Sequence, residues 1–149
     1  MKSARRRARE LCLQATYQWL VNGGDSADLL SQLKEVKDYP NADAKFLAAL
    51  LHDTLAQADA LRALLVPLLD RPLRELSPVE HALLLQASCE IVSRQDTPYR
   101  VIINEAIELA KSYGGTDGHK YVNGVLDKLA AQVRPAEVAA KHVAKQRAE

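Results

Sequence analysis

The chain opens with a cluster of basic residues whose chemistry suits a polyanion. Its members are Lys2, Arg5, Arg6, Arg7 and Arg9, and no acid stands among the first nine residues. The planar guanidinium group of arginine fits phosphates and stacks on bases. Cations at the N-terminus of a helix oppose the helix macrodipole, so local helix stability does not explain the cluster. On a helix the four arginines span about 400° and form a collar around the first turn and a half. Charge alone leaves two interpretations open, a polyanion-binding collar and a solvated helix end.

An aromatic residue extends this candidate surface. Leu11, Ala15 and Trp19 follow the spacing of one buried helix face, and Tyr17 lies off that face. We therefore expect Tyr17 to be exposed, where its ring offers a plane on which a nucleic-acid base can stack.

A second candidate binding segment is GGTDGHKYVNG, residues 114–124. Its glycine-rich turn leads into a helix N-terminus, where free N–H groups favour anions. Lys120 adds positive charge, Tyr121 offers a second stacking surface, and Asp117 can accept hydrogen bonds from base amino groups. The structural alternatives are a helix C-cap at the two glycines and an N-cap at Thr116 or Asp117.

Patterns typical of catalysis or metal binding are missing from the sequence. The four histidines are His52, His81, His119 and His142, and no two of them stand three or four residues apart. Glu80 and His81 are adjacent and point about 100° apart on a helix, which makes a poor acid–base pair. The two cysteines, Cys12 and Cys89, lie in helical patterns as expected for buried, reduced thiols. We expect neither an enzyme nor a bound cofactor or metal.

Composition indicates a single all-α domain. The chain has 149 residues, is 48% hydrophobic but only 5% aromatic, and carries a formal net charge of +1. Abundant Ala and Leu favour helices over strands. The hydrophobic periodicity predicts six or seven helices, including segments at about 3–21, 26–36, 43–66, 78–94, 98–113 and 117–133. The residues after Pro135 form a polar tail that we expect to be frayed or weakly helical.

Local signals mark where several of these helices begin and end. Asn22-Gly23-Gly24 should end the first helix, and Asp25 or Ser26 should begin the second. Ser77, Pro78 and Glu80 match the N-cap, the first helical residue and the third residue of a capping box.

The basic N-terminal segment also invites a reading as a targeting signal. A secretory signal needs a continuous apolar stretch, and Glu10, Gln14 and Gln18 interrupt the one here. An arginine-rich transit peptide fits the composition better, but Tyr17 and Trp19 suit a packed helix. No apolar run approaches the roughly 18 residues of a membrane-spanning helix.

Four segments carry a family resemblance, namely RRRARELCLQATYQW, LSPVEHALLLQASCEI, PYRVIINEAIELAKSYGG and HKYVNGVLDKL. In this order and spacing they resemble the NusB family of bacterial transcription antitermination proteins over most of residues 2–134. The resemblance implies an all-helical fold of two packed sub-bundles. It also implies an RNA-binding domain at residues 1–135, followed by the polar tail at residues 136–149.

The resemblance further implies a function in transcription. Members bind boxA, a single-stranded element in the leader RNA of ribosomal operons, together with NusE, a small-subunit ribosomal protein. The complex promotes processive transcription of ribosomal RNA, and its other components are RNA polymerase and further Nus factors. Some members form homodimers that bury the RNA surface. These properties imply a cytoplasmic location.

Carried over by position, the family's functional residues fall on the candidates above. The RNA-contacting positions are Lys2, Arg5, Arg6, Arg7, Arg9, Tyr17, Asp117, Lys120 and Tyr121. Tyr121 stands where the family also has Phe, which keeps a stacking surface. Glu80 matches a position associated with NusE contact, although its place in the capping box gives it a second explanation.

Two other classes of protein remain as alternatives. A pure protein-interaction module would bind NusE without discriminating between RNAs, with its basic end as solvated surface. An enzyme would need a pocket lined by histidines or acids with perturbed pKa values. The same helical domain also occurs attached to an RNA methyltransferase, an enzyme that needs a second, nucleotide-binding domain. We expect no such second domain in these 149 residues.

Overall fold

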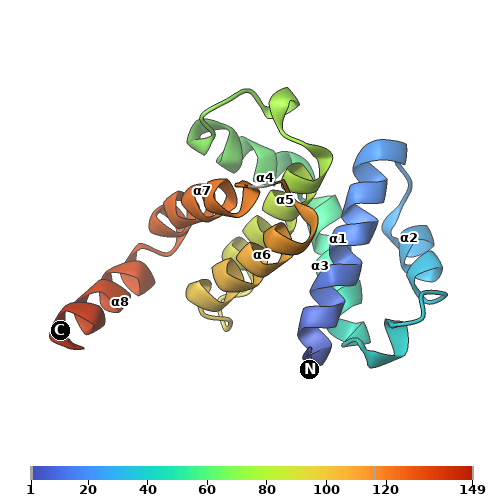
Figure 1. Ribbon diagram of the computed structural model, residues 1–149, viewed down its shortest axis with the longest axis horizontal. Helices are drawn as coiled ribbons and strands as arrows, with labels where there is room; N and C mark the ends of the chain where they lie inside the picture. Colours follow the sequence, from blue (N-terminus) through green and yellow to red (C-terminus); the bar gives the residue numbers. More distant parts are fainter. Residues whose placement is uncertain (1, 116, 149) are drawn as a thin grey trace.

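The computed structural model describes residues 2–115 and 117–148. Within these residues the secondary structure consists only of helices, joined by turns and loops. Eight α-helices and three short 3-10 helices make up the fold (Figure 1). The α-helices are α1 (Ala4–Asn22), α2 (Ser26–Leu33), α3 (Ala44–Ala56), α4 (Ala58–Leu65), α5 (Pro78–Ser93), α6 (Tyr99–Tyr113), α7 (Gly118–Val133) and α8 (Pro135–Ala148). The 3-10 helices are η1 (Tyr39–Asn41), η2 (Val66–Leu68) and η3 (Leu73–Glu75). The predicted fold class is confirmed, whereas the predicted count of six or seven helices is wrong.

The extra helices arise at two places. The long helix expected after Asp43 is divided at Gln57, whose φ of −102° and ψ of 9° depart from helical values. Backbone hydrogen bonds still run from Gln57 N to Asp53 O and from Leu61 N to Gln57 O, so the division is a local distortion that periodicity does not reveal. The tail after Pro135, expected to be frayed or weakly helical, is the 14-residue helix α8.

The helix ends follow the signals in the sequence. Ser77 Oγ accepts a hydrogen bond from the N–H of Glu80 at 3.1 Å, and Asp25 Oδ1 accepts one from Asp28 at 2.8 Å. Gly23 and Gly24 end α1 with φ values of 76° and 113°, which residues with a Cβ rarely adopt. Local chemistry therefore fixes where these helices begin and end.

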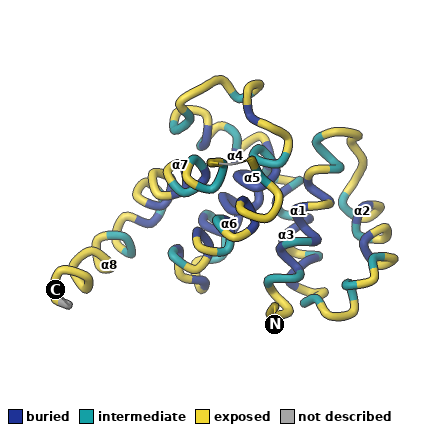
Figure 2. Tube along the Cα trace, in the orientation of Figure 1, coloured by how far each residue is buried: buried dark blue, intermediate teal, exposed yellow. Residues whose placement is uncertain are grey.

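Helix α5 is the centre of the molecule. It packs against α1 and α3 on one side and against α4, α6 and α7 on the other. All ten residues from Ala82 to Ile91 are buried, as expected for a helix surrounded by others (Figure 2). Buried side chains from all of α1 to α7 form one continuous hydrophobic core around α5.

A buried ion pair fixes α1 on α5. Arg9 Nε and Nη2 donate to the two carboxylate oxygens of Glu90 at 2.9 and 2.8 Å, and the two side chains are only 6% and 2% exposed. Burial by itself would lower the pKa of Arg9, but the bonds to Glu90 outweigh it and raise that pKa, so the arginine stays charged. Gln86 Nε2 adds a hydrogen bond to the carbonyl oxygen of Arg9 at 2.9 Å.

A second buried arginine anchors the C-terminal part of the chain. Arg134, between α7 and α8, donates to the carbonyl oxygens of Glu90, Ile91, Arg94 and Thr97 at 2.7–3.2 Å. These carbonyls lie at the C-terminal end of α5 and just after it, where the macrodipole favours a cation. Those of Glu90 and Arg94 also accept backbone N–H groups, from Arg94 at 2.8 Å and from Thr97 at 3.0 Å. Arg134 thus caps α5 and fixes the point from which α8 departs.

Two further predictions from the sequence concern the cysteines and membrane-spanning helices. Cys12 and Cys89 are both free and buried, as predicted, and burial raises the pKa of each thiol. Among the helices of the described residues, none combines the length and apolarity needed to span a bilayer.

We predict that Arg9→Met lowers the free energy of unfolding by about 3–5 kcal/mol, because it leaves the Glu90 carboxylate buried without its cation. Urea denaturation measures this change. The double variant Arg9→Met/Glu90→Leu should recover most of the loss, since it removes both buried charges. Arg5→Met, which removes an exposed pair, is the control and should cost less than about 1 kcal/mol. Equal losses in the single and double variants would contradict a role for the ion pair.

Candidate nucleic-acid interface

Every cation of the N-terminal cluster is paired with an acid. Lys2, just before α1, pairs with Glu10 of α1 at 2.7 Å, and the four arginines reach acids elsewhere in the chain. Their partners are Asp43 for Arg5 at 3.7 Å, Glu105 for Arg6 at 2.9 Å, Asp38 for Arg7 at 2.7 Å and Glu90 for Arg9 at 2.8 Å. Local helix stability does not explain these arginines, but contacts with distant parts of the chain give each of them a partner.

The cluster is graded in exposure, so it is not a uniform collar. The side chains of Arg5, Lys2 and Arg6 are 52%, 51% and 40% exposed, whereas those of Arg7 and Arg9 are 22% and 6% exposed. The expectation that all four arginines ring the surface therefore needs correction at Arg9. Its guanidinium is held inside the protein by Glu90 and does not face a ligand.

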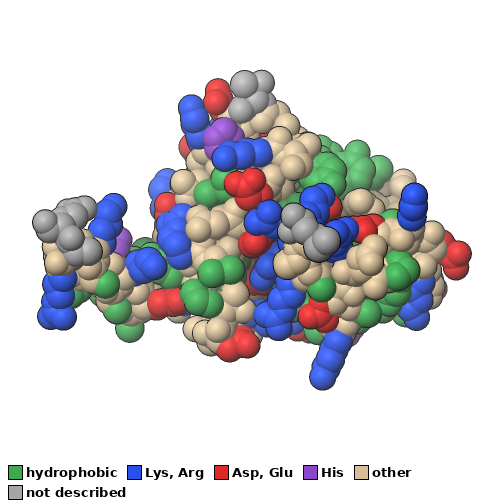
Figure 3. Space-filling view, turned by 60° about the horizontal axis from the view of Figure 1, so that its bottom comes forward, with side chains coloured by type: hydrophobic (Ala, Val, Ile, Leu, Met, Phe, Trp, Pro, Cys, Tyr) green, Lys and Arg blue, Asp and Glu red, His purple; other side chains and the backbone are tan. Residues whose placement is uncertain are grey.

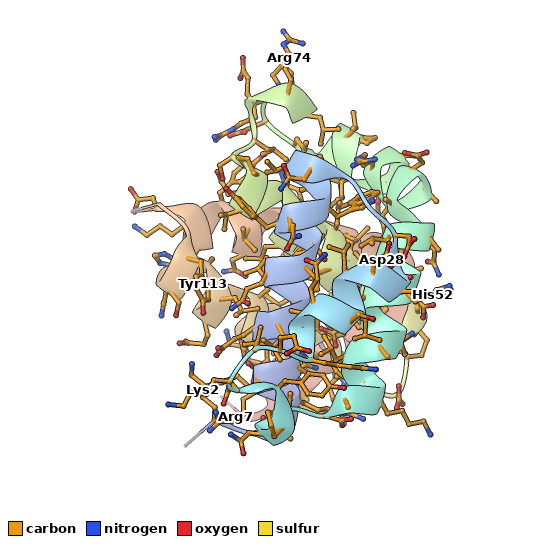
Figure 4. The ribbon with its side chains drawn as sticks, turned by 90° about the vertical axis from the view of Figure 1, so that its right-hand side faces the viewer. Lys2, Arg7, Asp28, His52, Arg74 and Tyr113 are labelled. Carbon is orange, nitrogen blue, oxygen red and sulfur yellow. The ribbon has the colours of Figure 1, made fainter. Side chains whose placement is uncertain are left out.

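The exposed pairs can be exchanged for other anions. The hydrogen bond and charge of Glu10 raise the pKa of Lys2, and the bond from Arg7 lowers the pKa of the Asp38 carboxyl, so both pairs are charged at neutral pH. Ion pairs this exposed add little to stability, so a phosphate can replace the carboxylate partner. Lys2 and Arg7 lie at the end of the molecule where α1 begins (Figure 4).

Tyr17 is exposed, as predicted, and it lines an apolar groove. The groove has a volume of about 510 Å³ and lies between α1 and the end of α6. Its walls include Tyr17, Val21, Val79 and Tyr113. Tyr17 is 41% exposed, Val21 55% and Tyr113 45%. Tyr113 is exposed because α6 leaves the core in its last turn, after Ala110.

The glycine turn after α6 depends on a close backbone approach. Gly114 is the C-cap of α6, and its N–H donates to Ala110 O at 2.7 Å. A Cβ at Gly114 would lie 2.7 Å from the same oxygen, whereas a Cβ at Gly115 would meet nothing within 4 Å. The expected C-cap is therefore confirmed at Gly114, and the missing side chain is what lets the turn start there.

Asp117 occupies the N-cap position of α7 without capping it. Its side chain makes no hydrogen bond to the helix and instead pairs with Lys120 at 3.5 Å, and both side chains are about three-quarters exposed. Both groups are thus open to a ligand. Thr116, the alternative cap residue, lies outside the described residues.

Tyr121 is half-buried under an arginine that the sequence did not single out. The guanidinium of Arg71 lies 4.2 Å from the centre of the Tyr121 ring and pairs with Asp70 at 2.7 Å. Burial, with the nearby charge of Asp70, raises the pKa of Tyr121. Arg71 comes from an irregular proline-containing segment whose place in the fold follows only from the packing, so no local signal could have found it.

The structure brings several predicted site residues into one hollow. Glu80, Asp117 and Tyr121 line a depression of about 240 Å³, together with Arg71 and two glycines of the turn. Val79, the neighbour of Glu80, lines the Tyr17 groove, so the two hollows adjoin at the start of α5. The basic cluster lies at the other end of α1, about 18 Å along the helix from Tyr17. The candidate residues therefore form an extended band of three parts, the basic cluster, the Tyr17 groove and the Tyr121 hollow.

Of the four histidines, His81 takes a structural position. His81 Nε2 accepts a hydrogen bond from Arg62 Nε at 3.1 Å, and burial followed by the charge of Arg62 lowers its pKa, which keeps it neutral. His52 Nδ1 lies 3.3 Å from Asp53 on the surface. Over residues 2–115 and 117–148, no three His, Cys, Asp or Glu side chains gather in a group suited to a metal ion.

Comparison with known proteins identifies the same family over most of the chain. The sequence profile of the NusB family matches residues 6–131. A transcription antitermination protein NusB of Bordetella pertussis is 54% identical over 143 residues, covering 93% of each chain. The homologous protein of Paraburkholderia phytofirmans is 53% identical over 140 residues, covering 94% of this chain and 97% of that one. Both relatives are named as antitermination proteins and not as enzymes, in line with the sequence analysis.

Solved structures share the fold. NusB of T. maritima superposes with a TM-score of 0.79 at 28% identity and covers 93% of this chain and 99% of its own. A chain from the crystal structure of the antitermination factors NusB and NusE in complex with double-stranded RNA superposes with a TM-score of 0.80. At 22% identity, with coverage of 89% of this chain and 99% of that one, this second likeness concerns the fold alone.

We predict that Gly114→Ala lowers the free energy of unfolding by about 1–3 kcal/mol, because its Cβ must push the backbone of the preceding turn aside. Gly115→Ala is the matched control, since the same methyl group enters open space there. Urea denaturation of the two variants measures the difference. If they are equally stable, the close approach at Gly114 does not constrain the turn.

Proposed function

The chain belongs to the NusB family, and from this premise we propose that it is a transcription antitermination factor that binds boxA RNA together with NusE. In this role it promotes processive transcription of ribosomal RNA in the bacterial cytoplasm. RNA polymerase and the other Nus factors are its partners in the larger complex. The family match over residues 6–131 supports the general role.

One observation carries the assignment of the RNA surface. The exposed cations of the N-terminal cluster sit on weak ion pairs at one end of α1, and the exposed ring of Tyr17 lies on the same helix. Specific RNA-binding surfaces join phosphate contacts from cations to aromatic planes on which unstacked bases lie. The band from the basic cluster to the Tyr121 hollow has both ingredients.

The individual cations have different roles in this proposal. Lys2, Arg5 and Arg6 exchange their carboxylate partners for RNA phosphates, and Arg7 does so to a smaller extent because it is more covered. Arg9 acts indirectly, since its bonds to Glu90 hold α1 in place.

The turn at the start of α7 supplies the second set of RNA contacts. Lys120 contacts phosphate, Asp117 accepts from a base amino group, and Tyr121 stacks on a base once Arg71 moves aside. Their exposure and shared hollow support this assignment.

Glu80 serves as a contact for NusE in this proposal. Only its backbone N–H takes part in the cap with Ser77, so its carboxylate remains available beside Arg71. The adjoining Tyr17 groove is apolar and exposed, as a protein partner requires. Residues 1–135, organised in two sub-bundles that share α5, form the binding domain, and residues 136–149 form a separate tail. Where a homodimer forms, it would cover this same surface.

A second candidate function is a protein-interaction module without RNA discrimination. The complete pairing of the N-terminal cations favours it, because none of the five is unpaired among the described residues. Titration of the protein with boxA RNA and with a scrambled RNA, with and without NusE, separates the two functions. Equal affinity for the two RNAs alongside firm NusE binding would favour the second function.

We predict a salt dependence for RNA binding. About four neutralised phosphates on a single strand give a slope near −3 for log affinity against log salt. Arg5→Gln should reduce that slope by about 0.7, whereas Lys45→Gln, at an exposed residue that is not among the proposed contacts, should leave it unchanged. Fluorescence anisotropy at several salt concentrations measures both slopes. An affinity that does not change with salt would refute the electrostatic part of the proposal.

We predict that Tyr121→Ala weakens boxA binding by about 1–3 kcal/mol, because it removes a stacking surface. Tyr121→Phe should retain the affinity, since the hydroxyl group has no hydrogen-bond partner within the described residues. Thermal unfolding of both variants checks that the domain remains folded. Unchanged RNA affinity in a folded Tyr121→Ala variant would remove Tyr121 from the site.

A further inference from the structure

Helix α8 departs from the body of the protein from a rigid base. Arg134 is buried in five hydrogen bonds, one of them to Glu137 Oε2 at 3.0 Å. The other carboxylate oxygen of Glu137 accepts from the N–H of Tyr99, at the start of α6, at 3.1 Å. Burial by itself would raise the pKa of Glu137, but the Tyr99 N–H and Arg134 outweigh it and lower that pKa. The helix therefore projects in a defined direction (Figure 1).

The cations of α8 differ from those of the N-terminal cluster in forming no ion pair among the described residues. Lys141, Lys145 and Arg147 are exposed and make no ion pair with any acid of residues 2–115 and 117–148. The sole acid in this helix is Glu137, whose carboxylate already binds Tyr99 and Arg134. Basic side chains gather on the projecting end of the molecule (Figure 3). An unpaired cation binds a phosphate without first losing a partner, so this end is the better prepared of the two basic regions.

A groove runs between α8 and the start of α6. It has a volume of about 290 Å³, with Pro98, Tyr99, Ala140 and Ala144 among its walls and Arg100 and Lys141 along its sides. Arg100 is about one-third exposed and also contacts Asp127 and Asn123 of α7 at 3.0 and 3.4 Å. Glu137 also lines the groove, but its carboxylate is bound to Tyr99 and Arg134. Apolar walls with two cations along them suit a single extended strand.

Helix α7 connects this groove to the proposed RNA surface. It begins at the turn that carries Asp117 and Lys120 and ends at Arg134, where α8 starts. Its 16 residues span about 24 Å, which a stacked strand covers in about seven nucleotides at about 3.4 Å each.

We infer that α8 and Arg100 form a second RNA-contacting surface, which binds the phosphate backbone of nucleotides flanking the specifically recognised element, independently of their sequence. This inference rests on the proposed function for the order of the contacts along one RNA. It commits to RNA because the cations are dispersed along an exposed helix and lead from the proposed site. An acidic protein partner is the competing occupant.

The test uses the full chain and a triple variant, Lys141→Gln/Lys145→Gln/Arg147→Gln. Glutamine keeps the helix propensity close to that of lysine and arginine, so α8 should persist. The matched control is Lys34→Gln/Lys37→Gln/Lys45→Gln, which removes the same charge from exposed residues remote from α8. Circular dichroism and thermal unfolding check both folds. Each protein is titrated with a 12-nucleotide boxA RNA and with the same RNA extended by ten nucleotides on either side.

The α8 variant should bind the extended RNA more weakly than the wild type, with a salt slope less steep by about 2. It should match the wild type on the short RNA, and the control variant should match the wild type except for a small uniform effect of net charge. Equal losses in the two variants on the extended RNA would overturn the inference. Unchanged RNA binding with weakened NusE binding would assign α8 to a protein partner and also overturn it.

The proposed function is tested separately in the same experiment. If the wild type fails to distinguish boxA from scrambled RNA, the proposed function fails. The α8 contribution would still be visible on extended scrambled RNA, because contacts to phosphates do not depend on sequence.

Discussion

The buried ion pair between Arg9 and Glu90 is the interaction on which the rest of the structure depends. It fixes the rotation of α1 about its own axis relative to α5. With Arg9 directed inward, Ala8, Leu11 and Cys12 enter the core and Tyr17 faces outward. Arg5 lies one turn before Arg9 on the same face, and it is exposed because it stands at the start of the helix. Because two opposite charges in a low-dielectric interior tolerate little displacement, the pair specifies orientation more strongly than apolar packing alone. The part of the band that α1 supplies is thus the outer side of a helix whose inner side carries a buried charge.

Helix α5 connects the position of α1 to that of the C-terminal part of the chain. Glu90 receives Arg9 on one side, and its carbonyl oxygen receives Arg134 on the other. Two buried arginines, one near each end of the chain, therefore meet at the same turn of the central helix. Arg9 positions α1 with its basic cluster, and Arg134 positions α8 with its unpaired cations. The two basic regions of the molecule are in this way oriented from a common point inside the core.

The candidate site could be predicted only in part from the sequence. Tyr17 is exposed because it lies off the apolar stripe of its helix, and that stripe is written locally. Tyr113 and Arg71 were missed because their surroundings come from other elements, namely the groove wall of α1 for Tyr113 and the ring of Tyr121 for Arg71. The sequence also could not show whether the arginines are paired with acids, because a run of cations looks the same in the sequence whether its members are free or paired.

The sequence by itself determined the helical class and most helix ends, because caps at Ser77, Asp25 and Gly23 act within a few residues of themselves. It also determined the family, through motifs spread over most of the chain. Only the tertiary structure decided which cations face solvent and which stabilise the fold. The acids that pair with Arg7, Arg9 and Arg6 stand 31, 81 and 99 residues away, and nothing local to α1 specifies them. Electrostatic partners are chosen by distance in space, and that distance exists only once α1, α5 and α6 have packed together.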